Sequence, residues 1–156
     1  MTGLLIRTLV FTVVVPATMA AYIPWAIIGA TGDRFDVSGL RALGLVPIAA
    51  GLVVGAVCFA GFVVEGRGTP APYDPPRRLV TGVLYQRVRN PIYLAGTSLL
   101  LGESIVFGSY ALLAWTAAAW LIWHLTVVLY EEPGLRARFD GAYDDYTRSV
   151  PRWIPR

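Results

Sequence analysis

Four apolar runs separated by polar segments dominate this chain. The first two cover about residues 4–28 and 40–64, and each is long enough to cross a bilayer, which takes about 20 mostly apolar residues. The third run covers residues 92–107 and the fourth covers residues 110–130. Only two residues separate the last two runs, so the pattern predicts a tight helical hairpin. The chain is therefore expected to be an all-α, polytopic membrane protein with four spanning helices.

Prolines and glycines within the first two runs are expected to modify these helices. Pro16 and Pro24 lie inside the first run and predict a kink, which membrane helices tolerate. Gly51 and Gly55 lie four residues apart in the second run, so they share one helix face. This face is expected to pack closely against a neighbouring helix.

The segments outside the runs contain residues that interrupt helices or carry charge. Residues 66–90 contain repeated Gly, Pro and Arg and predict a cytoplasmic loop. In the tail, apolar residues recur at steps of three and four, at Leu135, Phe139, Tyr143 and Tyr146. This spacing predicts a C-terminal amphipathic helix that starts at Pro133 and lies on the membrane surface. We therefore expect residues 1–156 to form a single membrane domain with four parts: residues 1–65 (two spanning helices), 66–90 (loop), 91–130 (hairpin) and 131–156 (cytoplasmic tail).

The composition supports lipid as the solvent of this chain. Hydrophobic residues make up 56% and charged residues 15% of the sequence, against about 25% charged residues in soluble domains. The net charge is only +3, which does not indicate nucleic-acid binding. The single Cys excludes an internal disulfide, and with one Cys and one His we expect no metal site.

All basic side chains are arginines, and their positions predict the orientation in the membrane. Most of them lie at the entry to the first run, in residues 66–90 or after the fourth run, whereas Arg34 and Arg41 fall near the opposite ends of the first two runs. With four spans, the Arg-rich segments lie on one side, which the positive-inside rule assigns to the cytoplasm. We therefore expect a multi-pass protein of the cell membrane with both termini in the cytoplasm.

Two polar clusters lie at the predicted cytoplasmic ends of the hairpin. The first, at the start of the third run, consists of Tyr85, Arg87, Arg89, Asn90 and Tyr93. The second, at the end of the fourth run, is the adjacent pair Glu131 and Glu132. A hairpin brings its two open ends together, so these clusters are expected to form one pocket for a polar, zwitterionic ligand.

The two clusters also carry a family resemblance. Between Gly82 and Tyr93, a Gly and a Tyr are followed by Arg-Asn-Pro-Ile-Tyr at the start of a predicted membrane helix. Further on, the Glu pair is followed by Leu135, by Phe139-x-Gly141, by Tyr143 and Tyr146, and by the run Val150-Pro-Arg-Trp-Ile-Pro155. Over roughly residues 66–156, this arrangement resembles the isoprenylcysteine carboxyl methyltransferase and phospholipid methyltransferase families.

The resemblance implies a membrane-embedded methyltransferase that binds S-adenosylmethionine in a pocket closed by the C-terminal tail. Carried over from the family pattern, the cofactor-binding residues are Tyr85, Arg89, Asn90, Pro91, Tyr93, Glu131 and Glu132. Of these, Arg89 and Asn90 are the candidate catalytic residues. The family pattern has His at the position of Asn90, and an Asn side chain forms hydrogen bonds but does not titrate near neutral pH. We expect this position to supply a hydrogen bond and not a base.

Other polar side chains in the apolar runs and the tail have weaker signals. His124 shares a helix face with Glu131, and Arg152 lies in the tail, so both are candidate substrate-binding residues. Arg87 is interpreted as a cytoplasmic anchor. Glu103 is expected at the outer interface of the hairpin, although an ionisable residue in a membrane helix is a functional hint by default.

The sequence leaves the methyl acceptor and the oligomeric state open. Four spanning helices favour a lipophilic or prenylated acceptor that reaches the site from membrane lipids, and an isoprenylcysteine-like carboxylate, a lipid-like acid or a phospholipid amine are all candidates. One alternative is a membrane reductase that uses NADPH on a sterol-like or lipid substrate, but more basic residues would then be expected for the extra phosphates. The other alternative is a non-catalytic membrane protein, which would not need a polar cluster at the hairpin ends.

Overall fold

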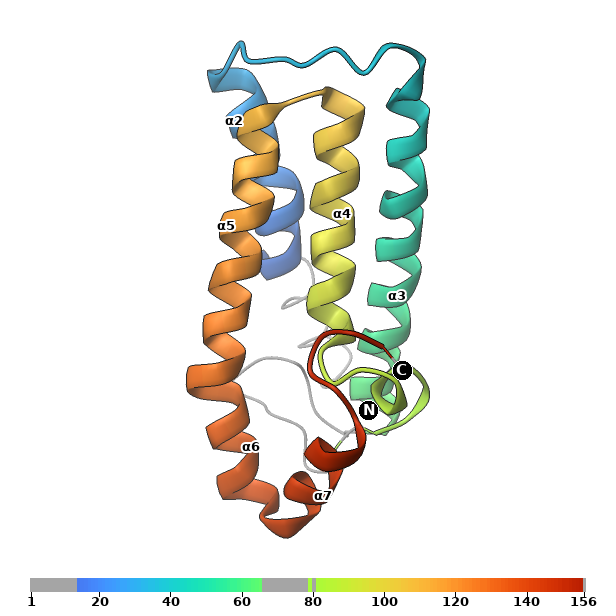
Figure 1. Ribbon diagram of the computed structural model, residues 1–156, viewed down its shortest axis with the longest axis vertical. Coiled ribbons are helices and arrows are strands. Elements are labelled where there is room, and N and C mark those ends of the chain that lie inside the picture. Colours follow the sequence, from blue (N-terminus) through green and yellow to red (C-terminus); the bar gives the residue numbers. More distant parts are fainter. Residues whose placement is uncertain (1–13, 66–78, 80, 156) are drawn as a thin grey trace.

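The computed structural model describes residues 14–65, 79 and 81–155, and every regular element in this part of the chain is helical (Figure 1). The predicted all-α class is therefore confirmed for the described residues. The chain is helical from Val14 to Ala30, which includes α2 (Ile23–Ala30). The other α-helices are α3 (Leu45–Val64), α4 (Pro91–Phe107), α5 (Tyr110–Thr126), α6 (Glu132–Phe139) and α7 (Gly141–Ser149).

Within the described residues, two continuous helical stretches are long and apolar enough to cross a membrane. Gly39–Val64 has 26 residues and Tyr110–Phe139 has 30 residues. At about 1.5 Å per residue these stretches are about 39 and 45 Å long, which exceeds the ~30 Å hydrocarbon core of a bilayer. Two shorter apolar helices, Val14–Ala30 and Pro91–Phe107, accompany them. The predicted second, third and fourth runs are thus helices, whereas part of the predicted first run lies outside the described residues.

The first helix changes its hydrogen-bond pattern between its two prolines. A π-helical turn, Thr18–Tyr22, lies between Pro16 and Pro24, and regular α-helix resumes at Ile23. A proline cannot donate its backbone hydrogen bond, and a wider π turn is a common way for a helix to absorb such an interruption. The predicted kink therefore takes the form of a local π-helical turn.

Helices α3 and α4 approach closely through glycines. A Cβ atom added at Gly51 would lie 2.6 Å from the carbonyl oxygen of Ala95, and one added at Gly102 would lie 2.5 Å from the carbonyl oxygen of Gly44. The hydroxyl of Ser98 also donates to the carbonyl oxygen of Pro47, at 2.8 Å. The predicted packing role of Gly51 is confirmed.

The second glycine of the predicted pair, Gly55, contributes less. A Cβ atom at Gly55 would meet its nearest neighbour, the Cβ atom of Ala95, only at 4.0 Å. The close contact therefore repeats at the seven-residue spacing of Gly44 and Gly51, because these two positions face α4 directly.

Replacing Gly51 with leucine is expected to destabilise the protein by about 1–3 kcal/mol or more, the usual cost of overpacking a tight contact. The leucine side chain would collide with the backbone of α4, which has no space to yield. The matched variant Gly55→Leu should cost much less. Thermal unfolding of both variants in detergent would check this, and equal losses for the two would contradict the packing described here.

The turn of the hairpin is formed by two residues that each have a clear role. Gly108 has a left-handed backbone, with φ of 61°, which glycine adopts without strain. The Ser109 hydroxyl caps α5 by accepting from the backbone N–H of Leu112 at 3.2 Å. The carboxylate of Asp33, from the loop before α3, accepts from the backbone N–H of Ala111 at 2.7 Å. The predicted tight hairpin is therefore confirmed, and the 31–37 loop is tied to its turn.

The tail differs from its prediction. The expected single amphipathic helix from Pro133 is wrong, because α5 continues through a π-helical turn, Val127–Glu131, into α6 without leaving its axis (Figure 1). The π-helical turn lets the helix pass Pro133, which lacks a backbone donor. The break occurs instead at Asp140, whose φ of 45° ends α6 and reverses the chain into α7. The glutamate pair therefore lies inside a long helix and not at its end.

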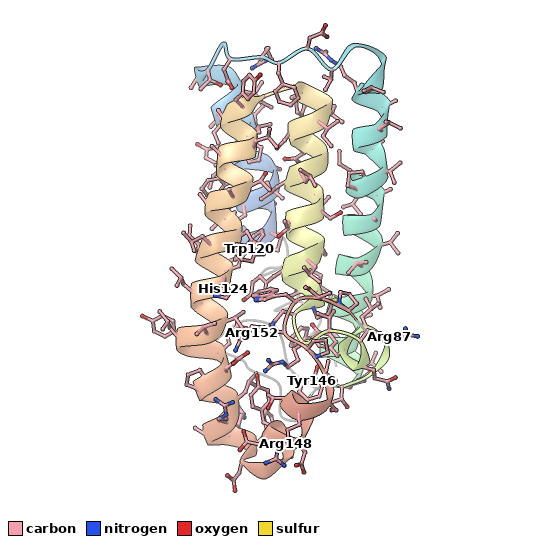
Figure 2. All side chains as sticks on the ribbon, in the orientation of Figure 1. Arg87, Trp120, His124, Tyr146, Arg148 and Arg152 are labelled. Carbon is pink, nitrogen blue, oxygen red and sulfur yellow. The ribbon has the colours of Figure 1, made fainter. Side chains whose placement is uncertain are left out.

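The polar loop before the hairpin is only partly described. Of the predicted 66–90 loop, the described part includes a short 3-10 turn, Val83–Gln86, that leads into α4. Arg87 is exposed beside this turn, at the same end of the molecule as α6 and α7 (Figure 2). Three further arginines of the predicted loop, Arg67, Arg77 and Arg78, lie outside the described residues.

Candidate functional site

The open end of the hairpin joins the two predicted polar clusters. The hydroxyl of Tyr93, in the first turn of α4, donates a hydrogen bond to the carboxylate of Glu131. Arg89, directly before α4, places its Nη1 atom 3.1 Å from Oε1 of Glu132. Two pairs of predicted site residues, each about 40 positions apart along the chain, therefore lie in direct contact, as a hairpin requires.

Glu132 is the buried centre of this site. Its side chain is only 6% exposed and lies between two guanidinium groups, those of Arg89 and Arg152. Arg152 binds it in a bidentate manner, with Nε 2.6 Å from Oε1 and Nη2 2.9 Å from Oε2. This fork geometry is the strongest common form of an arginine–carboxylate pair. Both oxygens of Glu132 are therefore already occupied by the protein's own cations.

The last residues of the chain form a strap across the start of α4, which we call the C-terminal strap (residues 150–155). The backbone N–H of Arg89 donates to the carbonyl oxygen of Pro151 at 2.9 Å. The side-chain amide of Asn90 donates to the carbonyl oxygen of Arg152 at 3.2 Å. Together with the Arg152–Glu132 pair, these bonds fasten the strap to both helices of the hairpin, as Figure 1 shows in red.

An aromatic cluster fixes the far end of the strap. The indole N–H of Trp153 donates to Nδ1 of His124 at 3.1 Å, and the His124 ring stacks on Trp120 with centroids 5.3 Å apart. In Figure 2, Trp120 and His124 lie on α5 above Arg152, on the side of the hairpin interior. His124, a predicted substrate-binding residue, thus holds the strap and is absent from the lining of the cavity described below.

Helix α7 closes the site from below. Tyr143 is buried, with 2% of its surface exposed, and burial raises the pKa of its hydroxyl. The hydroxyl of Tyr146 donates to the backbone carbonyl oxygen of Tyr85 at 2.7 Å, and burial raises the pKa of Tyr146 as well. Both phenols therefore remain protonated donors at neutral pH. The sequence placed these two tyrosines on a membrane-surface helix, so their position in the site was missed.

The site encloses a small cavity of about 70 Å³. Residues of α3, the segments before α4, the π-helical turn Val127–Glu131, α6 and α7 surround it: Phe62, Leu79, Tyr85, Arg89, Asn90, Val127, Glu131, Glu132, Leu135, Tyr143 and Tyr146. Five of the predicted cofactor-binding residues thus line it, namely Tyr85, Arg89, Asn90, Glu131 and Glu132. The other two, Pro91 and Tyr93, lie in the first turn of α4 directly behind this wall.

One donor in the site has no partner among the described residues. The Nε atom of Arg89 is buried and makes no hydrogen bond, although Nη1 of the same side chain pairs with Glu132. A buried N–H without an acceptor costs about 1–3 kcal/mol, more when it belongs to a charged group. Arg89 therefore has an unused, charge-assisted donor, and a bound carboxylate would remove this penalty.

The described site defines a class of protein. The described elements are all helical, and an Arg-Asn-Pro turn at the start of one hairpin helix pairs with two glutamates on the other. This is the arrangement expected of a membrane methyltransferase. The phospholipid methyltransferase family model matches residues 41–141, more than half of the chain, and the chain belongs to this family. The match begins within the turn that precedes α3, so it extends further toward the N-terminus than the predicted resemblance.

One curated protein and the solved structures complete the comparison. The chain is 27% identical over 124 residues to methanethiol S-methyltransferase 2 of Bradyrhizobium diazoefficiens. The aligned region covers 80% of this chain and 38% of that protein, so this chain spans well under half the length of the curated relative. No solved structure matches.

Proposed function

We propose that this chain is an integral-membrane methyltransferase that moves a methyl group from S-adenosylmethionine to a lipophilic acceptor. The observation that carries the proposal is the direct contact between the Arg-Asn-Pro turn and the glutamate pair, with Arg89 3.1 Å from Glu132. This contact gathers cationic, anionic and phenolic groups in one enclosed place, which suits a zwitterionic ligand. Membership of the phospholipid methyltransferase family supports the same activity.

In the proposed membrane arrangement, four helices cross the bilayer and both termini lie in the cytoplasm. The two long helical stretches support two of these spans, and Val14–Ala30 and Pro91–Phe107 are the apolar partners that supply the other two. The end of the molecule that carries α6, α7 and the strap also carries Arg87, Arg136 and Arg148. The positive-inside rule then places the candidate site at the cytoplasmic surface.

The donor and acceptor groups of the site fit S-adenosylmethionine. This cofactor supplies an electrophilic methyl group on a sulfonium when it is bound. The unpartnered Nε of Arg89 suits its carboxylate group. Glu131 suits its ammonium or ribose hydroxyls, because only the Tyr93 hydroxyl engages it in the described residues. Glu132, with both oxygens bound to arginines, is instead a positioning residue that holds Arg89 and the strap.

We infer that the strap, which bonds to the lining residues Arg89, Asn90 and Glu132, moves when the site admits the cofactor. Small-molecule sites typically enclose about 300–1,000 Å³, several times the 70 Å³ found here. The strap is attached by a few polar contacts to the ends of α4 and α5, and the side chain of Arg152 is still 34% exposed. Release of these contacts would open the site toward the cytoplasm and then close it again over the cofactor, which excludes water from the reaction.

Asn90 fits a supporting part in this scheme. Its side chain is 9% exposed, and its amide group holds the strap through the carbonyl oxygen of Arg152. An amide does not take up a proton near neutral pH, so the site does not rely on position 90 as a base. Among the candidate acceptors, an isoprenylcysteine-like carboxylate needs no base, whereas a phospholipid amine must first lose its proton. The relative is named for methanethiol, so a small thiol is a further candidate acceptor.

The proposal is tested by titrating the purified protein in detergent with S-adenosylmethionine, S-adenosylhomocysteine and NADPH. We expect the first two to bind with a Kd on the order of 1 μM–1 mM, the range of typical enzyme affinities, and NADPH to show no saturable binding. The double variant Glu131→Gln/Glu132→Gln should lose at least about tenfold in affinity for S-adenosylmethionine, which corresponds to about 1.4 kcal/mol.

A second adjacent acid pair offers a control of equal charge. Asp144 and Asp145 lie on α7, and both carboxylates form exposed ion pairs with arginines. Asp144→Asn/Asp145→Asn should therefore keep the wild-type affinity. Unchanged affinity in the glutamate variant would contradict the assignment of this site, and saturable binding of NADPH alone would favour a reductase.

A further inference from the structure

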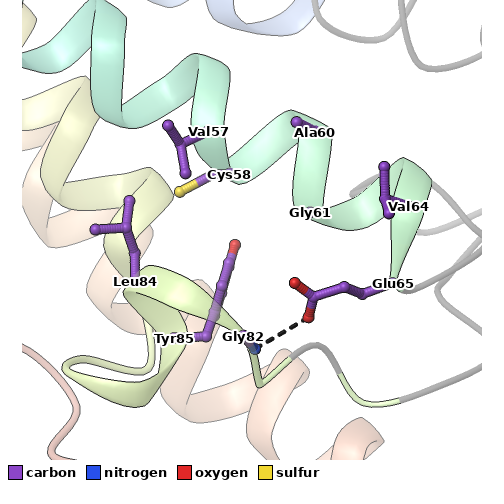
Figure 3. A pocket seen from close by; sticks show the side chains of 9 residues that line it. All are labelled: Val57, Cys58, Ala60, Gly61, Val64, Glu65, Gly82, Leu84 and Tyr85. Atoms are coloured by element: carbon purple, nitrogen blue, oxygen red, sulfur yellow. Dashed lines mark hydrogen bonds between the residues drawn. The ribbon is translucent and has the colours of Figure 1, made fainter.

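A second and larger cavity lies beside the candidate site. It has a volume of about 240 Å³ and is formed by the C-terminal end of α3 and the 82–85 segment (Figure 3). Its α3 wall is apolar and includes Val57, Cys58 and Ala60. An engineered apolar cavity of about 150 Å³ holds one benzene molecule, so this cavity has room for a ligand of about ten non-hydrogen atoms.

The position of the cavity connects it to the lipid. Val57 is 38% exposed and Val64 is 74% exposed, so the face of α3 that borders the cavity is also a surface expected to contact lipid. Helix α3 ends at Val64, directly before the charged side chain of Glu65. The cavity therefore lies at the level where the proposed membrane span meets the cytoplasm, and an apolar molecule can reach it laterally.

Two polar groups point into this otherwise apolar space. Tyr85 is 8% exposed, and its buried hydroxyl interacts with the Cys58 thiol, while no nitrogen or oxygen atom of the described residues bonds to it. Figure 3 shows this hydroxyl directed between Cys58 and Glu65. The Glu65 carboxylate accepts from the backbone N–H of Gly82 at 3.0 Å, which leaves its other oxygen for a ligand. A Cβ atom at position 82 would lie 2.1 Å from that other oxygen, Oε1, so glycine keeps this carboxylate in place.

Tyr85 connects the second cavity to the candidate cofactor site, because it lines both. The Phe62 ring packs edge-to-face against the Tyr85 ring, with centroids 5.9 Å apart, and both rings line the candidate cofactor site. A ligand held by this hydroxyl thus lies next to the proposed position of the methyl donor.

We propose that the cavity between α3 and the 82–85 segment is the acceptor site, and that it takes a small, neutral, apolar thiol. The proposal rests on the methyltransferase function argued above. A thiol sulfur accepts a hydrogen bond from the Tyr85 hydroxyl, and its S–H group faces the Glu65 carboxylate. A carboxylate acceptor would be repelled by Glu65, and a cationic amine would lose its hydration in the apolar part of the cavity.

The reaction balances with these groups. The bond between the methyl carbon and the donor sulfur breaks, and its electron pair stays on that sulfur, which becomes a neutral thioether. A new bond forms between the methyl carbon and the acceptor sulfur. The thiol proton passes to the Glu65 carboxylate and from there to water, and the product is a methyl thioether that is more apolar than the thiol and returns to the lipid.

The test measures binding of phenylmethanethiol to the full-length protein in detergent, by calorimetry, with S-adenosylhomocysteine present. Ala60→Phe places a ring in the cavity and should weaken thiol binding at least about tenfold, or about 1.4 kcal/mol, while S-adenosylmethionine affinity stays unchanged. Ala56→Phe is the matched control, because Ala56 is an exposed residue one turn earlier on α3 that does not line the cavity. It should leave both affinities unchanged.

A second variant keeps the proposal testable if Ala60→Phe folds poorly. Tyr85→Phe removes a hydroxyl whose neighbour is the weakly bonding Cys58 thiol, so it should destabilise the protein only slightly. It should nevertheless weaken thiol binding about threefold to tenfold, the value of one hydrogen bond. Benzylamine and phenylacetate, which have similar shapes, should bind more weakly than the thiol to the wild-type protein.

The outcomes separate the two proposals. Equal thiol affinity in the wild type, Ala60→Phe and Tyr85→Phe would overturn the acceptor site, and so would phenylacetate binding as tightly as the thiol or a lipid acyl chain occupying the cavity in place of the thiol. Thiol binding that Ala60→Phe abolishes, in a protein that binds no S-adenosylmethionine, would support the cavity as a thiol site and overturn the methyltransferase function instead.

Discussion

Replacing Glu132 with glutamine is expected to lower the free energy of unfolding by about 3 kcal/mol, because it leaves two arginines facing an uncharged amide. The value is at the lower end of the cost of breaking a buried ion pair, since Arg89 is 11% exposed but Arg152 is 34% exposed. The amide N–H₂ group would also point a donor at a guanidinium donor. Thermal unfolding in detergent gives the stability change, and limited proteolysis shows whether the strap has been released.

The control for this change is Asp145→Asn on α7. Asp145 also pairs with an arginine, Arg148, at 2.9 Å, but both side chains are more than three-quarters exposed. Exposed ion pairs contribute only about 0–1 kcal/mol, so this variant should unfold like the wild type. If Glu132→Gln were equally harmless, the carboxylate would not be the centre that fastens Arg89 and the strap.

Replacing Arg89 with alanine is expected to weaken S-adenosylmethionine binding about 30-fold or more, because the site loses a charge-assisted hydrogen bond of about 2 kcal/mol to the cofactor's carboxylate. The backbone of Arg89 still binds Pro151, so the strap keeps one of its attachments. Arg89→Lys separates two effects. A lysine ammonium still pairs with Glu132 and preserves stability, but it has no second, fixed donor for a ligand. We therefore expect near-normal unfolding and reduced cofactor affinity in Arg89→Lys.

Arg87 provides the control for Arg89. It lies two residues away, in the same turn before α4, and its side chain is exposed to solvent (Figure 2). Arg87→Ala should bind S-adenosylmethionine as the wild type does, in agreement with its interpretation as a cytoplasmic anchor. Similar losses in Arg87→Ala and Arg89→Ala would mean that general positive charge at this surface, and not the geometry of Arg89, attracts the cofactor.

Part of the site followed from residues that are close in sequence. The Arg89-Asn90-Pro91 turn and the Glu131–Glu132 pair stand at the two ends of a hairpin whose connection is only two residues long, so their meeting was predictable from helix lengths. Tyr143 was misplaced for the opposite reason. Its spacing, four residues after Phe139 and three before Tyr146, is typical of one amphipathic helix, but Asp140 adopts a positive φ between Phe139 and Tyr143 and turns the chain.

Other properties of the site came only from contacts across the fold. The amide of Asn90 holds the carbonyl oxygen of Arg152, 62 residues away, and a backbone carbonyl has no signature in a sequence. The direction of the Tyr85 hydroxyl, toward Cys58 and Glu65 in the wall of the second cavity, depends on the packing of α3 against the 82–85 segment. Sequence reasoning had assigned Tyr85 to the cofactor alone.

The sequence by itself determined the helical class, the positions of the apolar runs and the hairpin, because these depend on periodicity within a run and on short connections. It also determined that the Arg-Asn-Pro turn and the glutamate pair stand at the two ends of this hairpin. The tertiary structure decided which glutamate is saturated by arginines, where the tail reverses and how the strap is fastened to the hairpin. Those features arise from side chains and carbonyl groups that meet only after the helices pack, and local pattern holds no information about such distant pairings.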